Sequence, residues 1–162
     1  MASIIIRSNA GLGLAALLLV GCGGLYVSPL SPPAYRAEVR APYDAAWTAL
    51  VQALAKGNIP LRAIARDSGV IASDEFVTPI GVMADCGRIG DDRIEGEALV
   101  SFTIFADDNG PQTRLLINSK MRTLAWRRGS SGGYKPAPVH QCVSTGRFEA
   151  NLFDALQEST KK

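Results

Sequence analysis

Two long stretches in the middle of the chain alternate between apolar and polar side chains. They run from Glu97 to Ala106 and from Thr113 to Trp126, with the turn-forming stretch Asp107 to Pro111 between them. Every second side chain of a strand points to the same face. The apolar faces are formed by Ala98, Val100, Phe102, Ile104, Leu115, Ile117, Met121 and Ala125. This pattern predicts a long antiparallel hairpin with one face in the core and the other in water.

Two amphipathic helices are predicted to cover the apolar face of the hairpin. The first runs from Ala41 to about Lys56, with Pro42 and Asp44 in its first turn and a stop at Gly57. Its apolar face comprises Tyr43, Trp47, Leu50, Val51 and Leu54. The last helix is expected to be capped by Ser144 or Thr145. Its apolar face comprises Phe148, Leu152, Ala155 and Leu156.

The remaining regular segments complete an α+β domain. Tyr35 to Arg40 reads as a first strand, and Pro60 to Arg66 with Val70 to Val77 reads as a second hairpin. The predicted order is β-α-β-β-β-β-α, a single antiparallel sheet of about five strands with two helices packed on one face. Two long irregular stretches remain, Thr78 to Gly96 and Arg127 to Gln141.

The N-terminus carries a short apolar segment that ends at a cysteine. Arg7 is the one charge before the run Gly11 to Val20, which is too short to span a bilayer as a helix. Leu19-Val20-Gly21-Cys22 resembles the lipobox of bacterial lipoprotein precursors. The resemblance implies cleavage before Cys22 and lipidation of that cysteine. A plain secretory signal ending at Gly21, or an uncleaved anchor, are the alternatives.

This reading divides the chain into three parts. Residues 1–21 are the signal peptide, residues 22–34 are a Gly-, Ser- and Pro-rich lipidated tether, and residues 35–162 form one periplasmic domain. The alternative is that an apolar part of this tether packs on the domain, and Leu25 to Val27 is the segment most suited to do so. In lipoproteins, a residue other than aspartate after the cysteine, here Gly23, implies export to the outer membrane.

The other two cysteines are expected to pair. An exported chain meets an oxidising compartment, so we predict a disulfide between Cys86 and Cys142, with two buried thiols as the alternative. A zinc site would have to recruit His140, the only histidine, and no cysteine or histidine pair has ligand spacing. We predict no metal site and no cofactor.

The charge balance and the lack of known motifs reduce the number of function classes that fit this chain. Without Arg7 the chain has 16 basic and 15 acidic side chains, so nucleic-acid binding is not expected. The acidic loop residues between Asp85 and Glu97 match no EF-hand register. His140 near Ser144 is the only pairing that suggests a nucleophile and base, and no acid in the sequence nearby orients it. We therefore expect no enzymatic activity.

A binding surface is predicted where the two long loops meet. Its candidate residues are Trp126, Arg127, Arg128 and Tyr134. An aromatic side chain on the polar side of a strand, next to basic residues and a long loop, is typical of an interaction surface. The basic residues Arg114, Lys120 and Arg122 extend it as a strip that suits lipid headgroups, lipopolysaccharide phosphates or an acidic partner. A solvated sheet face is the alternative reading.

The stretch Ala41 to Ile71 resembles the helix-grip domains of BamC-like envelope lipoproteins. The shared features are Pro-Tyr-Asp at 42–44, Trp47, Gly57, and Asp67 with Gly69 in the following turn. The resemblance implies a helix-grip fold, in which a helix is followed by a hairpin with Asp and Gly in its turn. The function is inferred from the lack of a convincing catalytic set and from the small tethered α+β domain. We therefore expect an outer-membrane lipoprotein that faces the periplasm, is held there by its lipid, and acts as an accessory or structural subunit with an envelope protein partner. A lipoprotein that binds a lipid or another small apolar ligand is the alternative.

Overall fold

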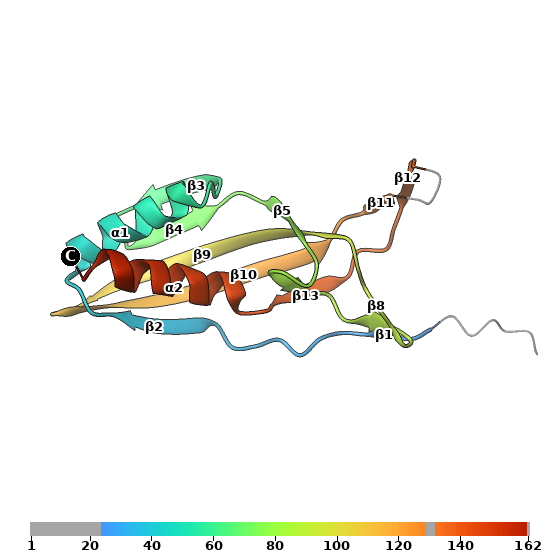
Figure 1. Ribbon diagram of the computed structural model, residues 1–162, viewed down its shortest axis with the longest axis horizontal. Coiled ribbons are helices and arrows are strands. Elements are labelled where there is room, and N and C mark those ends of the chain that lie inside the picture. Colours follow the sequence, from blue (N-terminus) through green and yellow to red (C-terminus); the bar gives the residue numbers. More distant parts are fainter. Residues whose placement is uncertain (1–23, 129–131, 162) are drawn as a thin grey trace, which may run out of the picture.

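The computed structural model describes residues 24–128 and 132–161. Its α+β class is as predicted, with two helices, α1 (Tyr43–Lys56) and α2 (Arg147–Ser159). The helices contact each other and lie on the same face of a long antiparallel sheet, as Figure 1 shows. Helix α1 ends at Lys56 as predicted and begins at Tyr43, two residues after the predicted start, with Pro42 at the N-cap position. It ends where Gly57 donates a backbone hydrogen bond to Ala53 and Asn58 takes a left-handed conformation, with φ of 52°.

The sheet is larger than predicted. Eight strands form it, and its centre is the hairpin of β9 (Glu97–Asn109) and β10 (Gln112–Thr123). On the β9 side lie β4 (Val70–Ser73), β5 (Phe76–Pro79) and, beyond β4, β3 (Leu61–Ala65). On the β10 side lie β2 (Tyr35–Val39), β13 (Gln141–Ser144) and, beyond β13, β6 (Ala84–Asp85).

The predicted single sheet of about five strands is therefore wrong in the number of strands and in the number of sheets. A separate three-stranded sheet contains β1 (Tyr26–Val27), β7 (Arg88–Ile89) and β8 (Asp92–Arg93). A two-stranded sheet contains β11 (Trp126–Arg128) and β12 (Tyr134–Pro136). Strands of two or three residues are too short to show an alternating pattern, so these segments read as irregular loops in the sequence.

The central hairpin has the predicted faces but a shorter turn. Ile104 pairs with Ile117, and the pairing continues to Asn109 and Gln112, so only Gly110 and Pro111 turn the chain. The predicted second strand is too long at its other end. Strand β10 stops at Thr123, and Ala125, which was expected in the core, is exposed.

The main core fills the space between the hairpin and the helices. Trp47, Leu50 and Leu54 of α1 meet Phe102 and Ile104 of β9 in this cluster. Helix α2 contributes Phe148, Leu152 and Leu156, as predicted, whereas Ala155 is exposed and Glu149 takes a buried position. The Phe102 and Phe148 rings stack with centroids 4.7 Å apart, which joins α2 to the sheet.

A second, smaller core lies at the other end of the hairpin. It contains Ala84, Cys86, Ala98, Val100, Met121 and Cys142. In Figure 1 this end carries β1, β8, β11 and β12, whereas the β9–β10 turn lies at the opposite end.

The segment expected to be a free tether is attached to the domain over part of its length. Tyr26 pairs with Ile89 and Val27 with Arg88, which makes β1 an edge of the three-stranded sheet. The Tyr26 hydroxyl donates a hydrogen bond to the Gln141 carbonyl at 3.0 Å. At Leu25 to Val27 the chain is therefore attached through the backbone of β1 and the Tyr26 side chain, whereas the Leu25 and Val27 side chains are exposed.

Candidate functional site

A disulfide joins the middle of the first long loop to the strand that follows the second. Cys86 and Cys142 are bonded to each other, as predicted. The pairing of Val143 with Asp85 and of Ser144 with Ala84 flanks this bond. The first loop is therefore fixed directly to the strand that precedes α2, and Cys86 is fully buried.

The predicted binding residues lie in the β11–β12 hairpin. Trp126 is opposite Pro136, and Arg128 is opposite Tyr134. Figure 1 shows this hairpin projecting beyond the body of the domain at the same end as β1 and β8. The side chains of Trp126, Arg127, Arg128 and Tyr134 lie outside what the structure describes, as does Cys22. The four residues belong to the strands of one hairpin, and their role in binding stays a prediction.

His140 stands against an aromatic ring and not beside the predicted serine. Its imidazole lies 4.3 Å from the Tyr26 ring, centroid to centroid. Ser144 instead bonds to Glu149 and to the Gly146 backbone. The two residues weighed as a base and a nucleophile therefore have separate partners.

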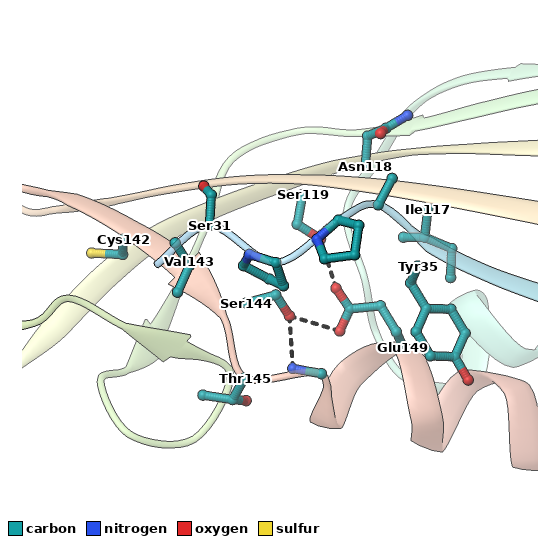
Figure 2. A pocket seen from close by; sticks show the side chains of 14 residues that line it. Ser31, Tyr35, Ile117, Asn118, Ser119, Cys142, Val143, Ser144, Thr145 and Glu149 are labelled. Carbon is teal, nitrogen blue, oxygen red and sulfur yellow. Dashed lines mark hydrogen bonds between the residues drawn. The ribbon is translucent and has the colours of Figure 1, made fainter. Parts of the chain in front are cut away.

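A gap in the sheet edge forms a surface pocket of about 280 Å³. Strand β2 pairs with β10 at residues 113–117 and β13 pairs with it at 121–122, which leaves residues 118–120 between the two partners. The chain from Ser31 to Tyr35 crosses this gap and lines the pocket together with Asn118 and Thr145. Figure 2 shows the pocket with the Glu149 carboxylate on its floor.

Among the described residues, Glu149 is the most deeply buried acidic or basic residue, with 2 % of its surface exposed. Its carboxylate accepts hydrogen bonds from the Ser119 hydroxyl at 2.9 Å and from the Ser144 hydroxyl at 2.8 Å (Figure 2). The Ser144 oxygen in turn accepts a bond from the Gly146 backbone N–H at 3.0 Å, next to the start of α2. A carboxylate in the first turn is also stabilised by the helix dipole.

Sequence reasoning missed this cluster, although one signal was present. Ser119 falls at a core-facing position of β10, between Ile117 and Met121, so a polar side chain interrupts the apolar face. Such an interruption indicates a buried hydrogen-bonding partner on the covering layer. Ser144 was expected to cap the helix, and Gly146 is the residue at the N-cap position.

Replacing Glu149 with alanine should lower the free energy of unfolding by about 1–3 kcal/mol, because two hydroxyl groups at the sheet–helix junction lose their acceptor. The matched control is Glu158→Ala on the exposed part of the same helix, with an expected change below about 0.5 kcal/mol. Urea denaturation of both variants measures the difference. Equal effects of the two substitutions would contradict a structural role for the Glu149 cluster.

The ionisation of two tyrosines is expected to make the free energy of unfolding depend on pH in the alkaline range. Burial, followed by the nearby Asp154 and Glu149 charges, raises the pKa of Tyr35 above its ordinary value of 10.0. Burial also raises the pKa of Tyr43, with Asp67, Asp44 and Asp108 adding to the rise and Arg66 opposing it. A raised pKa means that the folded state favours the neutral phenol, so this stabilisation is complete below pH 10 and is lost as pH rises through the folded pKa.

The free energy of unfolding should therefore fall as pH rises above 10, and Tyr35→Phe should make the fall smaller. Denaturant titrations at about pH 9 and about pH 11 provide the comparison. A drop of the same size in wild type and Tyr35→Phe would show that Tyr35 ionisation does not contribute.

The basic strip on the open face of the sheet is partly paired. Arg114 forms an ion pair with Asp107, and Arg122 forms one with Glu75 at 3.0 Å, all with exposed side chains. Exposed pairs of this kind contribute little to stability. Within 24–128 and 132–161, no group of three or more His, Cys, Asp or Glu side chains is arranged to hold a metal ion.

The comparisons with known proteins assign no family to this chain. No protein-family model matches the sequence, and a search of curated proteins finds no match. Neither helix in the described part of the chain is long and apolar enough to cross a bilayer.

Proposed function

We propose that the protein is a non-enzymatic lipoprotein anchored through Cys22 in the outer membrane, facing the periplasm. There it acts as an accessory or structural subunit of an envelope complex. We also propose that the domain is helix-grip-like. Support for this comes from the order of the main-sheet strands and the helices, β2-α1-β3-β4-β5-β6-β9-β10-β13-α2, which contains the predicted succession of elements together with three further short strands.

The observation that carries the proposal is that two of the three cysteines bond to each other and the third follows the apolar N-terminal run. Cys86 and Cys142 bond to each other within the domain, so the domain disulfide does not involve Cys22. Disulfides persist in oxidising compartments, which favours export. Cys22 stands directly after an apolar run of signal-peptide length, in a sequence similar to a lipobox.

The alternative, a lipoprotein that binds a small apolar molecule, has less support. The space between sheet and helices is occupied by the side chains of the main core, several of them fully buried. The lining of the pocket beside Glu149 mixes hydroxyl, amide and carboxylate groups with apolar side chains such as Pro33 and Ile117, so it lacks the mostly apolar lining that a small apolar ligand prefers.

Partner recovery tests the proposed role as a subunit. The β11–β12 hairpin is the proposed contact, so Trp126→Ala combined with deletion of Ser130 to Gly133 should lower recovery of the partner while the thermal midpoint stays nearly unchanged. Proteins that co-purify with the detergent-extracted wild type and variant are quantified by mass spectrometry.

The matched control is Ile64→Ala, which removes a half-exposed apolar side chain from the opposite edge of the sheet. It should leave recovery unchanged. Unaltered recovery in the hairpin variant would contradict the proposed contact. Recovery of the wild type without any envelope protein in comparable amount would contradict the role as a subunit.

A further inference from the structure

We propose that the outer face of the β1–β7–β8 sheet rests on the surface of an anionic phospholipid bilayer. The proposal builds on the proposed lipid anchor at Cys22 and adds an orientation of the domain. It places the domain against the membrane, where the sequence alone suggested a domain held away on a long tether.

The pairing of the three strands separates their side chains into two faces. Val27 is opposite Arg88, which is opposite Arg93, and residues directly opposite in antiparallel strands share a face. Tyr26, Ile89 and Asp92 form the other row. The Tyr26 ring and hydroxyl contact His140 and Gln141, so the Tyr26 row is on the side of the domain and the Val27 row is on the opposite side. Ile89 and Asp92, at the far end of the Tyr26 row, extend past these contacts and are exposed.

The outward face combines apolar and basic groups. Val27 is 43 % exposed and Leu25, on the same face by alternation, is 80 % exposed. Arg88 and Arg93 are exposed beside them on this face. Asp91 in the turn and Asp92 in the Tyr26 row are exposed as well, but neither belongs to the row of Val27, Arg88 and Arg93. Apolar side chains with flanking arginines are typical of surfaces that lie at the interface of an anionic membrane.

Leu25 is close in the sequence to Cys22, and for this reason we propose that the membrane covers the face that carries Leu25 and Val27. Only two residues separate Leu25 from Cys22, so the two Cα atoms lie within about 11 Å of each other even in a fully extended chain. A lipid at Cys22 therefore brings the bilayer surface within reach of Leu25 and Val27. A protein partner on the same face would have to exclude that bilayer.

Backbone contacts hold β1 in this position. Gly87 has φ of 77°, and a Cβ atom there would collide with the Val27 carbonyl oxygen. A Cβ atom at Gly24 would lie 2.9 Å from the Gly90 nitrogen. The Gly90 N–H also donates a hydrogen bond to the Leu25 carbonyl at 3.0 Å. These close approaches depend on glycine, and they keep the first described residues at the β7–β8 turn.

Tryptophan quenching tests the proposal on the full acylated protein. Leu25→Trp is made in a Trp126→Phe background, which leaves Trp47, a core residue, as the only other tryptophan. The protein is reconstituted in vesicles of phosphatidylethanolamine and phosphatidylglycerol whose acyl chains carry bromine. The introduced indole should sit within about 5–10 Å of the headgroup boundary, so its emission should be strongly quenched. Ile64→Trp in the same background is the control and should be quenched little.

Two further measurements keep the test independent of that substitution. Arg88→Gln with Arg93→Gln should reduce the quenching of the indole introduced at position 25, because phosphatidylglycerol loses its cationic partners. In wild type, hydrogen exchange of residues 24–27 and 88–93 should be slower in vesicles than in detergent.

Equal quenching at positions 25 and 64, or unchanged exchange of both segments, would overturn the proposed orientation. A protein partner on this face would give the same unquenched result at position 25. The mass of the N-terminal peptide reports separately whether Cys22 is acylated, so failure of the anchor and failure of the orientation are distinguishable.

Discussion

Replacing Cys22 with alanine should remove the protein from the outer-membrane fraction. Each buried methylene of an acyl chain contributes about 0.8 kcal/mol to membrane binding, and stable anchoring takes two membrane-binding signals, such as two acyl chains. The interfacial contacts proposed for β1, β7 and β8 are too few to replace such an anchor. The variant is therefore expected either in the soluble periplasmic fraction or as an unprocessed precursor.

Fractionation with immunodetection measures this effect. The matched control is the Cys86→Ala, Cys142→Ala double variant, which changes cysteines without touching the proposed lipidation site and should stay in the membrane fraction. Wild-type amounts of Cys22→Ala protein in the outer membrane would contradict anchoring through this residue.

Removing the disulfide should lower the free energy of unfolding by about 2–5 kcal/mol. The bond joins residues 56 positions apart, so its loss lets the unfolded chain gain much conformational freedom. It also lies in the smaller core with Ala98, Val100 and Met121, where truncation to alanine leaves unfilled space.

Denaturant unfolding of the Cys86→Ala, Cys142→Ala variant, beside wild type with and without reductant, measures the change. Reduced wild type should be destabilised to a similar degree. Alkylation of native protein from the envelope without reductant should label neither cysteine, and labelling of both would show that the bond is absent there.

Segments with a long regular pattern were predictable from the sequence. Helix α1 was predicted because its apolar side chains recur at helical spacing over its whole length and Gly57 follows its last residue. The β9–β10 hairpin was predicted because both strands have more than ten residues and alternate between apolar and polar side chains over most of their length. A regular pattern that extends over many residues can be recognised in the sequence without knowing which other segments it contacts.

Features that depend on contacts between distant residues were not predictable. The attachment of β1 requires Gly87 to come close to Val27, which no local pattern encodes. The burial of Glu149 depends on Ser119, which lies 30 residues earlier in the chain. The disulfide was predictable for a different reason, since an exported chain with three cysteines and one lipid attachment site leaves one pair.

The mass of the N-terminal peptide tests the proposed anchor most directly. Between Cys22 and Arg36 the sequence has no lysine or arginine, so trypsin should release this stretch as one peptide from protein extracted from membranes. We predict a peptide that begins at Cys22 and carries the added mass of lipid. An unmodified peptide from Ser8 to Arg36, or one that begins at Cys22 without lipid, would contradict the lipoprotein assignment.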